Sequence, residues 1–460
     1  MKLHQRKIKK NFGQLNNINM KNLIQEKNRR NFIKKTTLAT TGILSASMPV
    51  KSFANVLDNK KLKLALVGCG GRGSGAVVNA LTADDQVELV SMADVFKDRV
   101  DSSLKAIIDH FDGTKKIKVK DKNKFIGFDA YKNAIDEADV VILATPPGFR
   151  PYHFEYAVNQ DKHVFMEKPL ATDPVGIRKV MDMARVAKEK RLNVVVGLQR
   201  HYEKKYLTLF NKVAQGDIGK ITSGQVYWND GGVWVKQRQS GQSELEYQMR
   251  NWYYFNWICG DHILEQHIHN IDVANWFIGS YPKSAQGMGG RQTRTGKEYG
   301  EIFDHHYVEF NYNNGAVISS QCRHQKGCDS RVDEVFQGTK GTVELGKGLL
   351  SDLNGKVIYQ YPSKLGQEAN PYQVEHDELF KSIRNNGLIS DAENGAKSTL
   401  SAIMGRMATY TGRTVTWEEA LNSNHQLMPA SIDWDTTPPS LPDKNGFYPI
   451  PIPGVTKYST

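Results

Sequence analysis

The chain is poor in cysteine, and it lacks an apolar run long enough to span a bilayer. Four cysteines occur in 460 residues, at positions 69, 259, 322 and 328, and no two of them form a CxxC pair. This pattern does not predict a disulfide framework. The mildly apolar stretch 38–50 is short and rich in Thr, Ser and Gly, so no stable membrane insertion is expected.

Acidic residues are nearly absent from residues 1–54. This segment carries twelve Lys/Arg and a single acid, Glu26, and it therefore accounts for +11 of the net charge of +12. The remaining chain is close to neutral. A basic surface for DNA, RNA or anionic lipid is therefore not predicted, and no nucleic-acid partner is expected.

The basic segment has the features of an export signal. Asn28-Arg29-Arg30-Asn31-Phe32-Ile33-Lys34 has the twin-arginine pattern, the apolar stretch follows it, and Ala54 ends a candidate cleavage site. The sequence predicts a disordered leader over 1–54 and export to the periplasm by the twin-arginine route, which moves folded proteins. A basic disordered arm is the alternative, and Met20 is a second candidate start.

A glycine-rich turn follows the first apolar run after the leader. Leu62–Val67 is predicted as a strand, and a helical pattern over 73–82 follows the turn. Glycines permit a tight turn, let the backbone approach a pyrophosphate and let the helix pack closely on the strand. This predicts a dinucleotide site at Gly68, Gly70, Gly71, Arg72 and Gly73.

The end of the next strand indicates which dinucleotide binds. Residues 87–93 form an apolar run that ends in Asp94. An acid at this place can accept hydrogen bonds from both ribose hydroxyls of the adenosine, which favours NAD over NADP. Lys97 and Arg99 follow closely and weaken this preference.

Three further motifs complete a family pattern. Glu167-Lys168-Pro169 follows the apolar run 163–166, Thr145-Pro146-Pro147 follows the run 139–144, and Gly197-Leu198-Gln199-Arg200 follows the run 193–197. With the glycine turn, these motifs resemble the Gfo/Idh/MocA family of sugar and polyol oxidoreductases over residues 60–420. The resemblance implies that Lys168 lies beside the nicotinamide and the reacting hydroxyl, that Pro169 follows a cis bond, and that Thr145, Pro146 and Glu167 contact the cofactor.

The order of the patterns predicts an α/β fold with two parts. Strands at 62–67, 87–93, 139–144, 163–166 and 193–197 alternate with helices at 73–82, 97–110, 151–160 and 174–190. This alternation predicts a doubly wound parallel sheet, an NAD-binding Rossmann domain over 60–197.

The second part has a different character. Runs at 225–228, 306–312, 316–321 and 341–345, with a turn at Asn313-Asn314-Gly315, predict an α+β domain over 198–372 with a large, mostly antiparallel sheet. Helices at 374–385 and 393–411 are expected to pack back on the first domain, within 373–426. The proline-rich tail 427–460 is expected to lie extended on the body or on a neighbouring subunit.

Residues 261–278 are predicted to form one helix with a polar face. Its polar residues fall on one side at helical spacing, together with Val273 and Trp276, and the segment contains no Lys or Arg. A face of this kind is better suited to a cleft wall than to a solvated surface. The polar residues are Asp261, His262, Glu265, Gln266, His269 and Asp272.

The resemblance assigns chemistry to this face. Many family members carry an acid and a histidine four residues apart, and Glu265 and His269 have this spacing. The usual Asp, and the Gly two residues before the His, are replaced here by Glu265 and His267. We expect His269 to exchange a proton with the reacting oxygen, Lys168 to assist, and Glu265 or Asp272 to orient the imidazole. A zinc site at Asp261, His262 and His269 is the alternative, although no metal is predicted.

An aromatic-rich window precedes this helix. Four of the seven tryptophans lie within 228–257, where their faces can stack on sugar C–H surfaces and nearby polar groups can bind hydroxyls. His201 and His324 are weaker candidates for the same pocket. The predicted substrate residues are Arg200, Trp228, Asp230, Arg250, Trp252, Trp257, His262 and Asp272.

The leading hypothesis is an exported NAD-dependent oxidoreductase that converts a carbohydrate or glycoside to a ketosugar. Because free NAD is not expected outside the cytoplasm, the cofactor should be loaded before export and held through turnover. A redox-neutral NAD-dependent glycoside hydrolase or lyase and a non-catalytic NAD-dependent sugar-binding protein are the alternatives. The resemblance also implies a homodimer or homotetramer.

Overall fold

The computed structural model describes residues 60–113, 115–362 and 368–458. The predicted leader and export signal lie outside these residues. Of the helices described, none is both long and apolar enough to cross a membrane. All four cysteines, each within the described ranges, are free thiols.

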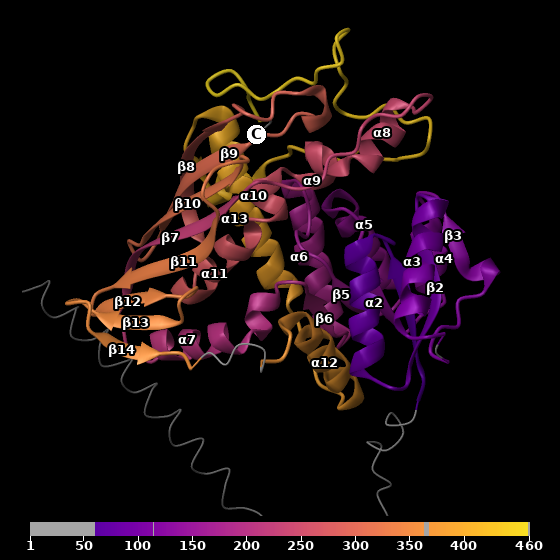
Figure 1. Ribbon diagram of the computed structural model, residues 1–460, viewed down its shortest axis with the longest axis horizontal. Coiled ribbons are helices and arrows are strands. Elements are labelled where there is room, and N and C mark those ends of the chain that lie inside the picture. The colour runs from indigo at the N-terminus through magenta and orange to yellow at the C-terminus, as the bar shows by residue number, and fades with distance from the viewer. Residues whose placement is uncertain (1–59, 114, 363–367, 459–460) are drawn as a thin grey trace, which may run out of the picture. The chain divides into compact units, whose positions relative to one another are not determined.

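The first domain is built on a six-stranded parallel sheet with the order β3-β2-β1-β4-β5-β6 (Figure 1). This is the Rossmann order, and it confirms the predicted doubly wound fold. Its strands are β1 (Leu62–Val67), β2 (Val87–Asp94), β3 (Lys124–Ile126), β4 (Val140–Leu143), β5 (His163–Met166) and β6 (Val194–Val196).

The predicted crossover helices of this domain begin within about two residues of their expected starts, whereas β3 and α4 had no predicted counterpart. Predicted and observed helices differ most at α2, which begins at Gly71 because the glycine turn itself supplies the first helical residues. The elements are α2 (Gly71–Ala83), α3 (Lys97–His110), α4 (Ala130–Asp136), α5 (Arg150–Asn159) and α6 (Pro174–Glu189), with short 3-10 turns η2 (Asp121–Asn123), η3 (Pro147–Phe149) and η4 (Gln199–Tyr202).

Two glycines let α2 pack against the sheet. Gly68 has φ +95°, and a Cβ there would lie 2.4 Å from the backbone nitrogen of Thr145. A Cβ on Gly73 would lie 2.2 Å from the carbonyl oxygen of Gly68. Backbone atoms cannot retreat from such contacts as the end of a flexible side chain can, so both positions require glycine.

Substitution of Gly73 by alanine is therefore expected to lower the free energy of unfolding by about 1–3 kcal/mol, because the new methyl group overpacks the junction of turn and helix. Gly75→Ala on the same helix is the matched control. Its Cβ meets only the Arg72 guanidinium at 3.9 Å, so it should stabilise the protein by up to about 1 kcal/mol through helix propensity. Urea unfolding compares the two variants, and equal stabilities would contradict this account.

The second domain is built on a nine-stranded sheet with the order β14-β13-β12-β11-β7-β10-β9-β8-β15. Only the β7–β10 pair is parallel, so the sheet is mostly antiparallel, as predicted. Its strands are β7 (Ile221–Asp230), β8 (Pro282–Gly290), β9 (His305–Tyr312), β10 (Val317–His324), β11 (Arg331–Gly338), β12 (Gly341–Glu344), β13 (Leu349–Asp352), β14 (Val357–Gln360) and β15 (Val415–Thr416).

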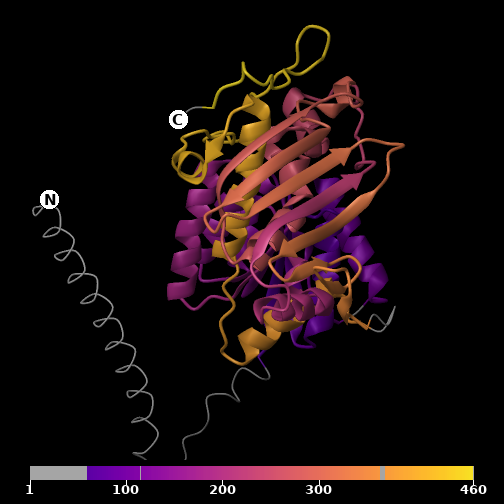
Figure 2. The same cartoon turned by 90° about the vertical axis from the view of Figure 1, so that its left-hand side faces the viewer.

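Helices cover one face of this sheet and join it to the first domain. The long α13 packs against both β8 and α6, and α12 packs against α2 (Figure 1). The opposite face of the sheet is open in Figure 2. The remaining elements are α7 (Lys204–Ala214), α8 (Glu244–Arg250), α9 (Asn256–Cys259), α10 (His262–Glu265), α11 (Ile268–Ile278), α12 (Pro371–Arg384), α13 (Ala392–Thr411) and α14 (Trp417–Asn422), with 3-10 turns η5 (Trp252–Tyr254) and η6 (Lys297–Tyr299).

The predicted single helix over 261–278 is wrong. Helix α10 ends at Glu265, α11 begins at Ile268, and Gln266 and His267 lie between them. Helix α11 is buried nearly all round between the sheet and α13, so Val273 is fully buried. The segment therefore has no continuous polar face, and its polar groups are divided among separate partners.

Candidate active site

A cavity of about 720 Å³ lies where the carboxyl ends of strands β1, β2, β4 and β5 meet the second domain. This edge is where ligands bind in open α/β sheets. The first domain contributes the glycine turn, Asp94, the Thr145 turn and the Glu167-Lys168 segment. From the second domain, the lining includes Trp228, Trp234, Trp252, Glu265, Gln266 and His269.

The start of α2 is shaped for a phosphate. Gly70 is its N-cap residue, no side chain caps the helix, and its first turn holds no acid. A Cβ on Gly70 or Gly71 would meet nothing within 4 Å, so the backbone here is open to a ligand. Free N–H groups at a helix N-terminus attract the negative charge of a pyrophosphate. These residues fit a dinucleotide.

Asp94 is held in place by the backbone around it. Its carboxylate accepts hydrogen bonds from the Cys69 N–H at 2.8 Å and the Phe96 N–H at 3.0 Å, one on each oxygen. Burial raises the pKa of this carboxyl. Each oxygen keeps a lone pair for a further donor, so the geometry is compatible with the predicted contact to a ribose diol.

Arg150 joins two of the predicted cofactor segments, and sequence reasoning did not single it out. Its fully buried guanidinium donates to the carbonyl oxygen of Pro169 at 2.8 Å and to that of Thr145. The Thr145 turn, with Pro146, and the Glu167-Lys168-Pro169 segment are thereby fixed relative to each other. Burial lowers the pKa of Arg150 to about 10, so it stays charged at neutral pH.

Glu167 faces the glycine turn. Its carboxylate lies 2.8 Å from the Nε of Arg72, and a Cβ on Gly197 would lie 2.8 Å from Glu167 Oε2. A larger side chain at position 197 would displace the Glu167 carboxylate, which explains why glycine occupies this position. The Lys168–Pro169 bond is cis, as the resemblance implied.

Lys168 and Glu265 meet in the cavity although they are 97 residues apart. The Lys168 ammonium donates to Glu265 Oε1 at 2.9 Å and to the Glu265 backbone oxygen. Both side chains are largely buried, with 13% and 16% exposed. The pairing fixes the ammonium at the junction of the two domains.

His269 lines the same cavity and is held by packing. Its ring stacks on Trp228 with centroids 5.8 Å apart. Its Nδ1 and the Trp228 Nε1 are both buried and have no hydrogen-bond partner among the described residues. The Nε2 of His269 is not among these buried atoms, so it is the ring nitrogen that a ligand in the cavity can reach. Burial, and then the charges of Lys168 and Arg200, hold the pKa of His269 well below 6.5, so the imidazole is neutral.

The expectation that Glu265 or Asp272 orients this imidazole is wrong. Glu265 is engaged by Lys168. Asp272 accepts hydrogen bonds from the Ser398 hydroxyl at 2.7 Å and from His201 at 2.7 Å, and it does not line the cavity. Glu265 lies at the end of α10, before the break at residues 266–267, and Asp272 lies on α11 after it.

Four other predicted substrate residues also lie away from the cavity. Buried Arg200 pairs with Glu334, which also accepts from Tyr206 and Asn270. Trp257 is a core side chain whose Nε1 donates to Gln248 Oε1 at 2.7 Å. Asp230 is exposed at the end of β7, where it accepts from the Gly231 N–H. His262 is the fourth.

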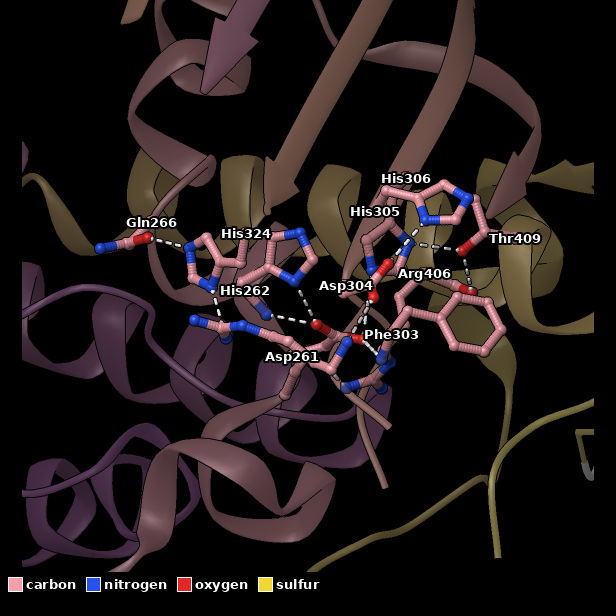
Figure 3. Close-up of polar contacts among 12 residues, drawn as sticks. Asp261, His262, Gln266, Phe303, Asp304, His305, His306, His324, Arg406 and Thr409 are labelled. Atoms are coloured by element: carbon pink, nitrogen blue, oxygen red, sulfur yellow. Dashed lines mark hydrogen bonds and ion pairs between the residues drawn. The ribbon is translucent and has the colours of Figure 1, made fainter. Parts of the chain in front are cut away.

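His262 belongs to a buried cluster around Asp261 (Figure 3). Atoms of Asp261, His262 and His306 lie within 4.8 Å of one another, close enough to hold a cation. His269 is not among them, so the zinc arrangement considered from sequence is wrong in its ligands. Asp261 already accepts from five donors: the His262 N–H, His262 Nδ1, His306 Nε2, the Phe303 N–H and the Tyr410 hydroxyl. Saturation of both oxygens indicates a structural hub.

Two segments distant in sequence meet at Phe96, on the Asp94 side of the cavity. Arg250, which lines it, lies over the Phe96 ring at 3.8 Å and forms an ion pair with Asp98 at 3.1 Å. From the tail, Trp434 packs on Phe96 and Phe128. Of the predicted substrate residues, Trp228, Arg250 and Trp252 line the cavity. Arg250 lies beside Phe96 and Asp98, near Asp94 and the expected cofactor site, and not beside Lys168 and His269.

Both domains match models of one known family. Residues 62–198 match the oxidoreductase family with an NAD-binding Rossmann fold, GFO_IDH_MocA, and residues 206–344 match the GFO/IDH/MocA C-terminal domain. Together these stretches cover more than half of the chain.

Individual relatives are more distant. The chain is 28% identical over 230 residues to inositol 2-dehydrogenase of Salmonella typhimurium, a stretch covering 49% of this chain and 57% of that protein. It is 27% identical over 220 residues to a glycosyl hydrolase family 109 protein of Shewanella pealeana, covering 43% of this chain and 45% of that protein. The chain thus spans about half the length of these relatives.

Solved structures share the fold. The scyllo-inositol dehydrogenase of Lactobacillus casei with bound NAD(H) and scyllo-inositol has a TM-score of 0.58 at 21% identity, covering 78% of this chain and 100% of that one. Levoglucosan dehydrogenase in complex with NADH and levoglucosan has a TM-score of 0.60 at 16% identity, covering 78% and 99%. With its glycine turn, its cavity and its two matched domains, the chain belongs to the Gfo/Idh/MocA family of oxidoreductases, and NAD is its cofactor.

Proposed function

We propose that this protein oxidises a ring hydroxyl of a carbohydrate or glycoside to a ketone, with hydride transfer to tightly bound NAD. One observation carries the proposal: Lys168, Glu265 and His269 line the same cavity as the glycine turn and Asp94. A donor, an acceptor and a dinucleotide cradle therefore share one enclosed space. The names of the inositol and levoglucosan dehydrogenases support a polyol or sugar as the substrate class.

The side chains divide the proton chemistry between them. When bound, NAD supplies the hydride acceptor. Neutral His269 accepts the hydroxyl proton at Nε2. The Lys168 ammonium donates to the same oxygen and stabilises the negative charge that develops there. Glu265 holds the ammonium in place.

The aromatic wall supports a sugar ring as the ligand. Trp228, Trp234 and Trp252 line the cavity, and Trp234 and Trp252 pack edge to face at 5.8 Å. Indole faces stack on the C–H surfaces of sugars, while the polar groups bind their hydroxyls. Trp234 is 43% exposed, so the aromatic wall of the cavity reaches the protein surface.

We further propose export by the twin-arginine route to the periplasm, with NAD loaded before export and retained. The contacts of Arg250 and Trp434 with Phe96 support retention, because they hold the α8 segment and the tail beside the part of the cavity near Asp94. NAD is therefore expected to copurify in stoichiometric amount with the protein and to remain bound through gel filtration. Mass spectrometry of the denatured, filtered protein checks this, and a cofactor-free protein would contradict it.

A homodimer or homotetramer formed through the open face of the nine-stranded sheet is also proposed. The support is the broad uncovered face in Figure 2 and the exposed apolar side chain of Met288 on β8. Light scattering of the purified protein tests the oligomeric state, and a monomer at micromolar concentration would contradict this proposal.

A panel of D-glucose, scyllo-inositol, levoglucosan and methyl and aryl β-D-glucopyranosides tests the reaction. Because the cofactor is retained, a carbonyl compound such as an aldose is added as a second substrate to take the hydride back, and ketosugar is then expected to accumulate. Release of the free aglycone without a ketosugar would favour the second candidate, a redox-neutral glycoside hydrolase, for which the family 109 relative is the supporting observation. Absence of any product or binding would overturn the proposed function.

A further inference from the structure

Gln266 is a polar residue of the cavity that the proposed chemistry does not use. It lies in the two-residue break between α10 and α11, directly after Glu265 and three residues before His269. It lines the cavity with both of them and with Lys168. Any substrate that reaches Lys168 and His269 is therefore close to this amide.

Arg294 determines which nitrogen of His324 carries the proton. Arg294 Nη1 lies 3.2 Å from His324 Nδ1. A guanidinium has donors but no acceptor, so His324 must accept at Nδ1 and carry its proton on Nε2. Burial, and then the neighbouring His262 and Arg294, hold the pKa of His324 well below 6.5, so the ring has a single proton.

His324 in turn determines which way the Gln266 amide points. His324 Nε2 lies 2.5 Å from Gln266 Oε1, so the N–H donates and the amide oxygen accepts (Figure 3). The NH2 group is left on the side away from His324. No described residue accepts a hydrogen bond from it.

We propose that Gln266 is a substrate-recognition residue that donates a hydrogen bond from its NH2 group to an oxygen of the carbohydrate, and that Arg294 and His324 are positioning residues that hold the amide in this direction. The inference rests on the proposed function, since it takes the ligand beside Gln266 to be a carbohydrate. It adds a selectivity: the enzyme rejects sugars that lack an acceptor at one particular ring position.

A cycle of variants and substrates tests the recognition. The reference sugar is the member of the panel above with the highest kcat/KM, and its monodeoxy and deoxyfluoro analogues are the probes. With the unaltered protein, one deoxy analogue should lose about 10–100-fold in kcat/KM, because the Gln266 donor is left unpaired. The fluoro analogue, which keeps an acceptor atom, should lose less. In Gln266→Ala the same deoxy analogue should lose about 2-fold or less relative to the parent sugar.

Gln266→Glu separates donor from shape. A carboxylate can still accept from His324 but offers the substrate an acceptor in place of a donor. We expect the parent sugar to lose about 10–100-fold in kcat/KM with the NAD content unchanged. Gln215→Glu, at the exposed end of α7, carries the same change of charge away from the cavity and should retain full activity.

The orientation itself has a readout that needs no substrate. Nitrogen-15 NMR of histidine-labelled holoprotein should show His324 as the neutral Nε2–H form, with the signal assigned by its loss in His324→Phe. A proton on Nδ1, or a doubly protonated ring, would overturn the orientation. Equal losses for every deoxy analogue in the unaltered protein and in Gln266→Ala would overturn the recognition while leaving the proposed function intact. If the unaltered protein binds and oxidises no member of the panel, the proposed function itself falls, and this assignment with it.

Discussion

Replacement of Lys168 by methionine is expected to lower kcat by about 10²–10³-fold, the usual cost of removing one donor to a developing oxyanion. Methionine is similar in length and fills the same space without the charge. Glu265 then loses its partner, but the fold keeps its core because both side chains lie at the cavity and not in the packed interior. Steady-state oxidation of the best panel sugar, with a carbonyl compound present to take the hydride back, measures the effect.

The NAD content of this variant is the essential control. Lys168 contacts Glu265 and lines the cavity, whereas the glycine turn and Asp94 are untouched by the change. Bound NAD should therefore remain proportional to the chain. Lys283→Met, on the exposed part of β8, removes the same charge elsewhere and should keep full activity. A Lys168→Met protein with normal NAD content and more than half of the activity would rule out the assigned role.

Replacement of His269 by glutamine is expected to lower kcat/KM by about 10²–10⁴-fold, the range for loss of a general base. Glutamine keeps a polar side chain against Trp228 but cannot take the hydroxyl proton at neutral pH. His110→Gln, on the exposed end of α3, is the matched control and should be neutral. Retention of most of the activity in His269→Gln would remove the histidine from the mechanism.

The pH profile adds a direction to this prediction. A base must be unprotonated to act, and the pKa of His269 lies well below 6.5 because it is buried beside Lys168 and Arg200. Activity should therefore hold constant as pH falls to 6.5, and decline only below that value. The contradicting result is a fall of kcat/KM centred at pH 6.5 or above that disappears in His269→Gln. It would show that the pKa of the His269 imidazole is not lowered.

Local patterns predicted the first domain and half of the site. The turn after β1, Asp94 after β2 and the Lys168 segment after β5 each depend on a strand end and its following loop, which are contiguous in sequence. Parallel strands bring their carboxyl ends to one edge, so these residues meet without further information. The four-residue spacing of Glu265 and His269 still predicted correctly that both line the cavity, although the helix is broken between them.

Side-chain contacts between distant segments could not be predicted from the sequence. Arg200 and Asp272 have the residue types of a polar site, yet Glu334 and Ser398, far along the chain, satisfy them in the interior. A helical projection of 261–278 assumes an unbroken helix, so the break at Gln266 invalidated its single face. The contact of Trp434 with Phe96 spans most of the chain and has no local signal.

A deuterium-transfer experiment tests the central claim most directly, namely that the sugar ring and NAD meet in the cavity of Lys168 and His269. The holoprotein is mixed with the best panel sugar, deuterated at every ring carbon, and the cofactor is recovered after one turnover. The account predicts reduced nicotinamide carrying one deuterium, with little formed by Lys168→Met or His269→Gln. Reduced nicotinamide without deuterium, or full transfer in both variants, would contradict it.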